Sequence, residues 1–230
     1  MDEGSRDVAA DVSGVAALAE PVRRRLYDVV VAGGAPIGRE EAAARAGVPV
    51  HTAKFHLDRL VDEGLLEVEF RRLTGRTGPG AGRPAKLYRR GLREISVSLP
   101  PRQYDLLSRI LANAVAAAGG VDEPVAEIAR RIAHGEGESL GAGSVGGETE
   151  LTRVEGALAA GGYEPHSDDE QIRLRNCPFH HAVQEQAALV CSLNLAYITG
   201  VCDGLACSTV RAELEPDPDH CCVVVRSHHA

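Results

Sequence analysis

The sequence predicts an α+β fold with an N-terminal winged helix-turn-helix, two central helices and a small C-terminal α/β domain. Three observations predict this arrangement. Short helical stripes of apolar residues are followed by two alternating, strand-like runs in the first 100 residues. Two longer amphipathic stripes follow the proline pair at 100–101. All six cysteines of the chain then fall between residues 177 and 222.

The first domain is expected over residues 15–100, after a polar, acidic and disordered N-terminus at residues 1–14. A helix over 20–31 has a proline in its first turn and ends at paired glycines. Helices over 39–46 and 49–63 each stop at a glycine. Only the tripeptide GVP separates the second helix from the third, and this is the spacing of a helix-turn-helix.

The third helix carries the first group of residues that we expect to meet DNA. Its inward face consists of Val50, Ala53, Leu57, Leu60 and Val61. The outward candidates are His51, Thr52, Lys54, Phe55 and Arg59. Basic side chains pair with phosphates, whereas Thr, His and Phe are short or flat enough to approach base edges or thymine methyls. The alternative is that these are ordinary solvated helix residues.

Two strand-like runs, LLEVEF and AKLYRR, follow this helix and are joined by a long Gly/Arg loop. This order predicts a wing whose arginines neutralise phosphates or enter the minor groove. Residues 71–93 contain eight basic residues and no acidic one, so they attract phosphate although the chain carries a net charge of −8. The candidate contacts are Arg72, Arg76, Arg83 and Lys86. A solvated flexible loop is the alternative.

The composition narrows the class of protein. Residues 101–230 carry a net charge of −10 against +2 for residues 1–100, so any affinity for nucleic acid lies in the first part. No apolar run approaches the roughly 20 residues of a membrane helix, and the acidic start is unlike a secretory signal. We therefore expect a cytoplasmic protein that does not span a membrane. No catalytic triad, P-loop or dinucleotide fingerprint is present, so we expect no enzyme.

Residues 101–134 are predicted to be dimerisation helices, over 102–118 and 123–134. Two half-sites one turn apart on DNA require two readers, so their apolar stripes are expected to pack against a twofold mate. The alternative is packing on the C-terminal domain of the same chain. Residues 135–148 are rich in Gly, Ser and Glu and read as a flexible loop. The C-terminal domain then occupies residues 149–230, with a helix over 149–160 and a strand over 171–175.

The cysteines form a candidate metal centre, because cytoplasmic thiols stay reduced. Cys177 and Cys191 meet only if the chain turns between them, near residues 186–189. Strand alternation turns Cys221 and Cys222 to opposite faces, with Cys221 slightly preferred. The expected set is therefore Cys177, Cys191 and one of Cys221 and Cys222.

The fourth ligand of this centre stays open. It is the other cysteine of the pair, His180, a solvent molecule or an external group. Cys202 and Cys207 read as small buried apolar residues. No CxxC pair exists, which disfavours a zinc ribbon, and widely spaced single cysteines suit an iron–sulfur cluster better.

Two stretches carry a resemblance to known proteins. The run TAKFHLDRLVDEGLLE resembles ArsR-like winged-helix regulators, and GRPAKLYRR resembles the wing of their SufR-type branch. The pattern NCPFH…LVC…LNLA…CCV is similar to the SufR-type sensor domain and to the vinyl-reductase-type domain. The resemblance implies a cluster-binding repressor of iron–sulfur assembly genes, with Cys177, Cys191 and one of Cys221 and Cys222 as ligands. A clear fourth matching cysteine is missing from the pattern.

The resulting hypothesis is a homodimeric regulator that binds double-stranded DNA under the control of a 4Fe–4S cluster, or a 2Fe–2S cluster. Zinc or arsenite binding, or thiol oxidation, at the same cysteines is a second hypothesis. A third is a vinyl-reductase-like redox or small-molecule-binding protein that uses the winged helix only to dimerise. The basic run at 71–93 argues against the third, since a pure dimerisation module has no need of it.

Overall fold

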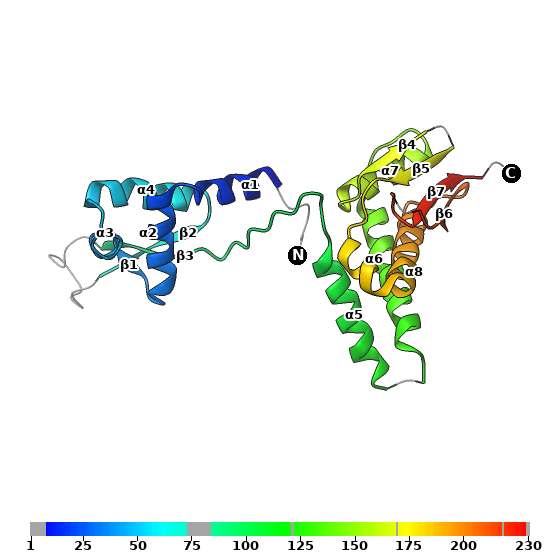
Figure 1. Cartoon of the computed structure of the whole chain (residues 1–230), viewed down its shortest axis with the longest axis horizontal. Helices are drawn as coiled ribbons and strands as arrows, with labels where there is room; N and C mark the ends of the chain where they lie inside the picture. The colour runs from blue at the N-terminus through cyan, green and yellow to red at the C-terminus, as the bar shows by residue number, and fades with distance from the viewer. Residues whose placement is uncertain (1–7, 73–83, 121, 169, 218, 229–230) are drawn as a thin grey trace. The chain divides into compact units, whose positions relative to one another are not determined.

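A computed structural model of the chain describes residues 8–72, 84–120, 122–168, 170–217 and 219–228 (Figure 1). The chain divides into two compact units, Met1–Val97 and Ser98–Ala230. Each unit has a hydrophobic core of its own. The domain boundary was expected after residue 100. It lies after Val97, so residues 98–100 are part of the second unit.

The first unit contains the helices α1 (Val8–Ala17), α2 (Pro21–Ala32), α3 (Arg39–Ala46) and α4 (Val50–Asp62). The Glu20 carboxylate caps α2, because it accepts hydrogen bonds from the N–H groups of Val22 (3.1 Å) and Arg23 (2.6 Å). Gly47 ends α3 in the left-handed conformation, at φ 66°. The connection from α3 to α4 is therefore as short as the glycine and proline spacing predicted.

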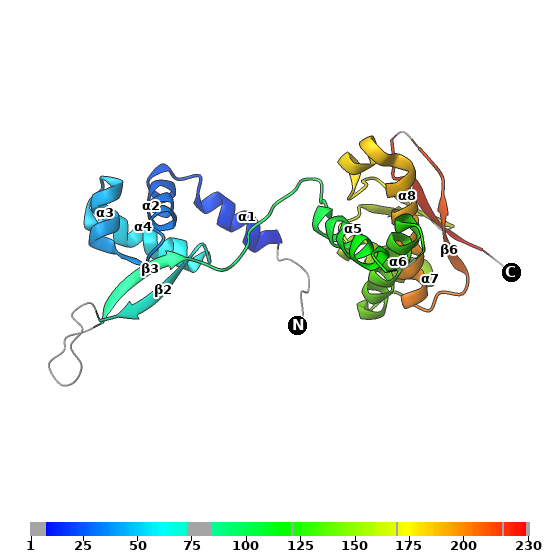
Figure 2. The same ribbon diagram turned by 90° about the horizontal axis from the view of Figure 1, so that it is seen from below.

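The strands β1 (Ile37–Gly38), β2 (Leu66–Arg71) and β3 (Ala85–Arg90) form an antiparallel sheet in the order β1-β3-β2. In the β2–β3 hairpin Leu66 lies opposite Arg90 and Arg71 opposite Ala85. Figure 2 shows this hairpin running along one side of the helices. The core between them is lined by Leu26, Val30, Ala53, Leu57, Leu60, Leu66 and Tyr88. Val50, expected to face inward, is instead 41% exposed at the first position of α4.

The expectation that residues 1–14 are disordered is wrong from Val8 onward, where α1 begins. Asp11 is buried and accepts a hydrogen bond from Arg93 at 2.6 Å. Gly14 lets the helix approach Ile95, whose side chain would lie 2.5 Å from an added Cβ. A long-range ion pair and a close contact thus hold a segment whose composition alone indicates no order.

The second unit contains the helices α5 (Tyr104–Ala118), α6 (Val125–Gly143), α7 (Glu150–Ala160) and α8 (His180–Gly204). Helix α6 continues through Gly143, so the expected flexible loop at residues 135–148 is wrong over most of its length. Two of the glycines in this predicted loop, Gly137 and Gly141, are contact points between α6 and α8. A Cβ on Gly137 would lie 1.9 Å from the Tyr197 carbonyl oxygen, and one on Gly200 would lie 2.0 Å from that of His134.

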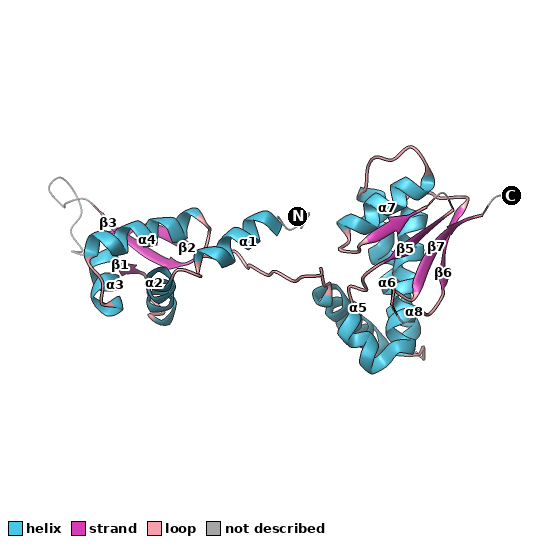
Figure 3. Cartoon of the chain, turned by 45° about the horizontal axis from the view of Figure 1, so that its top comes forward, coloured by secondary structure: helices cyan, strands magenta, loops and turns pink. Residues whose placement is uncertain are grey.

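The strands β4 (Pro165–Ser167), β5 (Gln171–Leu174), β6 (Val210–Leu214) and β7 (Val223–Ser227) form the second sheet, in the order β4-β5-β7-β6. All its neighbours are antiparallel. Figure 3 shows this sheet lying against α8. Its central β7 is buried at Val223, Val224 and Val225, and Val223 and Val225 pack with α8 into one core.

The apolar stripe of α5 packs within its own unit, which is the alternative that the sequence left open for the expected dimerisation helices. Leu106, Leu107, Ile110 and Ala114 are buried in the core of the second unit. Val115, from the same stripe, is 65% exposed. The stripe is therefore largely covered without a second copy.

Helix α8 is the one helix in the described part of the chain that is long and apolar enough, by length and composition, to cross a membrane. Its most apolar window is 44% buried inside this unit. The helix also contains a buried polar residue, Asn194, and a non-helical residue, Gln186.

Candidate nucleic-acid interface and cysteine centre

The outward face of α4 borders a surface groove of about 540 Å³. The groove is lined by Arg23, His51, Lys54, Phe55, Asp58, Arg59 and Asp62. Phe55 is 65% exposed, although a phenylalanine usually withdraws from water. His51, Lys54 and Arg59 are also exposed, while Thr52 is half-buried. The helix thus presents an aromatic ring beside both basic and acidic side chains, and such a ring can contact a thymine methyl.

Asp58 joins α4 to the hairpin through two of the candidate DNA contacts. Its carboxylate accepts hydrogen bonds from Lys86 Nζ (2.6 Å), Lys54 Nζ (3.2 Å) and the Tyr88 hydroxyl (2.8 Å). Partial burial acts to raise the pKa of Asp58, but the hydrogen bonds from Lys86, Tyr88 and Lys54 outweigh it and the pKa is lowered. The ionised Asp58 carboxylate pairs with Lys54 and Lys86. A DNA phosphate must therefore compete with Asp58 for these two ammonium groups.

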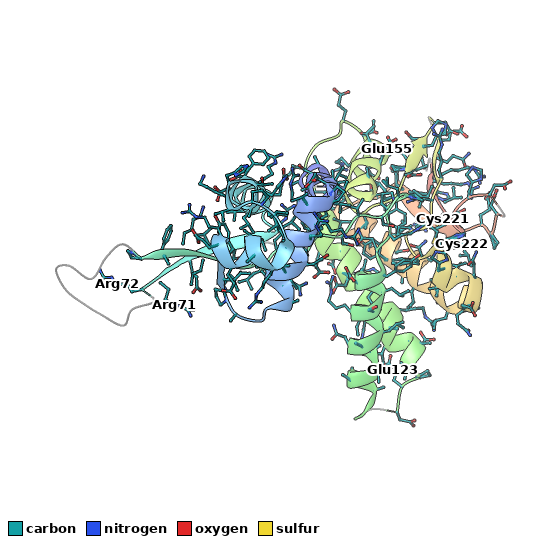
Figure 4. The ribbon with its side chains drawn as sticks, turned by 60° about the vertical axis from the view of Figure 1, so that its left-hand side comes forward. Arg71, Arg72, Glu123, Glu155, Cys221 and Cys222 are labelled. Carbon is teal, nitrogen blue, oxygen red and sulfur yellow. The ribbon has the colours of Figure 1, made fainter. Side chains whose placement is uncertain are left out.

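The remaining candidate DNA contacts differ in their exposure and in whether they already pair with a carboxylate of the protein. Arg59 forms an ion pair with Glu63 on the same helix. Arg72 is exposed just after β2, and Figure 4 shows it with Arg71 at the far end of the hairpin. Arg76 and Arg83 lie outside the described residues. Sequence reasoning missed Arg23, which reaches the groove from the run PVRRR at the start of α2 and donates to His56 Nδ1 at 3.4 Å.

Four of the six cysteines come together in the second unit, from three separate segments. Cys177 precedes α8 and Cys191 lies within α8. Cys221 and Cys222, labelled in Figure 4, precede β7. Between Cys177 and Cys191 the chain turns at Gln186, which has φ −140° and ψ 59°. This is the turn that the sequence spacing required.

The four thiols form a row in which each lies near enough to the next to shift its pKa. Cys177 interacts with Cys221, Cys221 with Cys222, and Cys222 with Cys191. The expectation that one cysteine of this pair is a ligand stays a prediction, because both Cys221 and Cys222 interact with the other thiols. Both lie before the first residue of β7, where the backbone bends and strand alternation does not apply.

The site favours protonated thiols when no ligand is bound. The hydrogen bond with Cys221, followed by burial, raises the pKa of Cys177 far above its usual range. The hydrogen bond with Cys177 acts to lower the pKa of Cys221, but its bond to Cys222 and burial outweigh it and raise the pKa to about 11. Burial raises the pKa of Cys191. A metal must displace these protons to bind.

Hydrogen-bond donors already point at two of the sulfur atoms. The backbone N–H of Phe179 is directed at Cys177 and that of Val223 at Cys221. Asn194 is completely buried and donates from Nδ2 to Cys221 Sγ at 3.1 Å. Its Oδ1 accepts a hydrogen bond from the buried Tyr163 hydroxyl. Sequence reasoning missed this pair; an asparagine inside the apolar run SLNLAY was the available signal.

The other candidates stand apart from this row. Cys202 is 4% exposed in the core, where burial raises its pKa to about 12. The N–H of Cys207 donates to the Cys202 carbonyl at 3.0 Å, and neither thiol takes part in the contacts described above. His180 is exposed and its ring pairs with Gln184.

Comparison with known families matches residues 18–69 to a helix-turn-helix domain family. The match covers less than a quarter of the chain and includes α2, α3 and α4 with most of β2. The protein is a DNA-binding transcriptional regulator. No curated protein and no solved structure matches the chain significantly.

The cysteines of this regulator fit a thiolate-bound metal group in their chemistry. Four thiols converge, donors face two of them, and the lining includes the apolar residues of the core. In the described residues, however, no three His, Cys, Asp or Glu side chains are yet arranged around one metal position. The sulfurs form a row, so loading requires them to close around a common centre.

Proposed function

We propose that this regulator is a cytoplasmic, non-enzymatic homodimer whose binding to operator DNA is controlled by an iron–sulfur cluster. The observation that carries the proposal is the row of four thiols formed by Cys177, Cys191, Cys221 and Cys222. Four cysteines are the usual ligand set of both 4Fe–4S and 2Fe–2S clusters. The resemblance of the cysteine pattern to SufR-type regulators favours 4Fe–4S and a repressor of cluster-assembly genes.

When bound, the cluster supplies an anionic, oxidation-sensitive centre. The four cysteines would hold it as thiolates, so the protons that burial retains in the free site would have to leave. Asn194 and the N–H groups of Phe179 and Val223 direct positive dipoles at the ligating sulfurs and so stabilise their negative charge.

In the first unit, the exposed face of α4 enters the major groove and the β2–β3 hairpin acts as a wing on the adjacent backbone. Two copies place two such faces on the half-sites of one operator. Loading shifts the population toward the arrangement that binds DNA, provided that the cluster binds this arrangement more tightly. Loss or oxidation of the cluster reverses the shift.

The test is anaerobic isolation of the whole chain, of Cys177→Ala and of Cys207→Ala. The wild-type protein and Cys207→Ala are expected to be brown and to contain iron and sulfide. Cys177→Ala is expected to lose both, together with cluster-dependent binding in a gel-shift assay. Equal iron and sulfide in all three proteins would remove Cys177 from the site and contradict the proposal.

A zinc site is the second candidate, and the closeness of the thiols favours it. Zinc is a single ion with Zn–S bonds of about 2.3 Å, so it holds four sulfurs closest together. A polynuclear cluster is larger and holds its cysteine sulfurs further apart. A colourless protein that contains zinc in a one-to-one ratio, with no sulfide, would replace the first proposal with this one.

A further inference from the structure

The main-chain carbonyl of Cys177 accepts a hydrogen bond from the segment that connects the two units. Residues 91–103 run from the end of β3 to the start of α5 without regular secondary structure. Residues 98–103 belong to the second unit. Each of residues 101–103 takes part in a hydrogen bond with residues 176–178.

The three contacts form a continuous seam. The Arg102 Nη1 atom donates to the Cys177 carbonyl oxygen at 2.6 Å. The Gln103 N–H donates to the Pro178 carbonyl at 3.1 Å, and Asn176 Nδ2 lies 3.4 Å from the Pro101 carbonyl. A change in the backbone at residues 176–178 therefore reaches residues 101–103 directly.

Residues 176–178 are themselves tied to the fold on the far side. Asn176 is buried; its Oδ1 accepts from the Glu164 N–H at 2.6 Å and its Nδ2 donates to the Gly162 carbonyl at 3.0 Å. The side chain of Asn176 thus holds one end of this turn, while the Cys177 thiol belongs to the cysteine row at the other. Closing of the thiols around a metal group displaces the turn at Cys177 while Asn176 resists.

We propose that Arg102 is the positioning residue that couples the state of the cysteine centre to the segment leading to the DNA-binding unit. The inference rests on the proposed function, because it needs a centre that is loaded in one state and free in the other. Arg102 is not a ligand in this account. Its role is to hold residues 101–103 against residues 176–178 in a way that differs between the two states.

The test compares wild-type protein with Arg102→Gln, Arg102→Lys and a control, Arg131→Gln. Arg131 is an exposed arginine of α6 that pairs with Glu123, so its removal takes away the same charge without touching the seam. Each protein is measured loaded and cluster-free, for metal content, for the dissociation constant of operator DNA, and for hydrogen–deuterium exchange of residues 98–103. Circular dichroism checks that each variant is folded.

Wild type and Arg131→Gln are expected to bind DNA at least roughly fivefold more tightly when loaded, the lower end of ordinary allosteric coupling. Their exchange over residues 98–103 should differ between the two states. Arg102→Gln is expected to load normally but to lose most of both differences, with partial retention in Arg102→Lys.

Full coupling and unchanged exchange in a loaded Arg102→Gln would overturn the inference and leave the proposed function intact. Failure of Arg102→Gln and Arg102→Lys to load would also overturn it, because Arg102 would then serve to build the site. If wild-type protein binds operator DNA with the same dissociation constant when loaded and when cluster-free, both the proposed function and this inference are wrong.

Discussion

The Nδ2 atom of Asn194 lies 3.1 Å from the Sγ atom of Cys221. Asn194 is fully buried in the longest helix of the second unit, and its other side-chain atom is occupied by the Tyr163 hydroxyl. A buried amide with both ends used has a fixed orientation, so its N–H stays directed at the sulfur. This pair connects the core of the unit to the electrostatics of the cysteine centre.

Replacing Asn194 is expected to change the electronic properties of the bound group. In Asn194→Leu the N–H donor to Cys221 is lost, so the reduced, more negative cluster is less stabilised and the reduction potential falls. Tyr163→Phe, which leaves that donor in place, is the control and should give a smaller shift. Redox titration of the loaded proteins measures both, and equal potentials in all three would refute the assignment.

The same Asn194→Leu variant is expected to lose stability. It leaves the Tyr163 hydroxyl buried without its acceptor, which costs about 1–3 kcal/mol. Tyr163→Phe removes the hydroxyl itself, so Asn194→Leu combined with Tyr163→Phe should recover part of the loss. Chemical denaturation of the metal-free proteins gives the comparison, and a double variant no more stable than Asn194→Leu alone would contradict it.

The DNA-facing residues make different kinds of contribution. Lys54→Gln and Lys86→Gln each remove one phosphate-seeking cation, so the salt dependence of log Kd should become shallower by about one. Phe55→Ala leaves the charge unchanged and is expected to weaken specific binding more than non-specific binding. Arg131→Gln is the control. Fluorescence anisotropy at several salt concentrations measures Kd for each variant. If the slope of log Kd against log salt concentration is unchanged in both lysine variants, these lysines do not contact DNA.

Two glycines of α6, two residues apart, should respond in opposite directions to alanine. Gly135 has open space where a Cβ would be, so Gly135→Ala is expected to stabilise the helix by about 0.5–1 kcal/mol. A Cβ at Gly137 would lie 1.9 Å from the Tyr197 carbonyl oxygen, and overpacking of this kind costs about 1–3 kcal/mol or more. Thermal unfolding measures both, and equal effects would contradict the close approach of α6 and α8.

The loop after α8 is held by one carboxylate with a strong pH dependence. Glu150 accepts hydrogen bonds from the N–H and hydroxyl groups of Ser208 and Thr209, and the backbone bonds come first in lowering its pKa to about 2. Since the folded pKa is below the unfolded one, the contribution is complete above pH 4.5 and disappears as the pH falls toward 2. Glu150→Gln should therefore destabilise the protein at pH 7 and make little difference near pH 2. A constant difference between Glu150→Gln and wild type across this range would contradict the assignment.

Local patterns were sufficient for much of the first unit. Gly47 and Gly64 both have positive φ, so the glycines that ended the predicted helices do so for the expected physical reason. The β2–β3 pairing follows from strand-like alternation in two adjacent runs. These features depend on a few neighbouring residues, which a sequence displays directly.

The errors arose where a residue's role depends on a distant partner. Gly137 and Gly141 read as flexible because the helix that they contact, with its own Gly200 and Gly204, lies far along the chain. Residues 8–14 read as disordered because Arg93, the partner of Asp11, lies far along the chain. The convergence of the cysteines was predictable from their spacing and the required turn, but the inclusion of Cys222 depended on a bend that no periodicity shows.

The central claim is tested most directly by the iron and acid-labile sulfide content of the whole chain isolated without oxygen. The account predicts a brown protein with about four iron and four sulfide per chain, as a 4Fe–4S cluster on four cysteines requires. Operator binding should weaken when the cluster is removed from the same sample. A colourless protein without sulfide, whose DNA affinity is the same before and after treatment with a chelator, would contradict it.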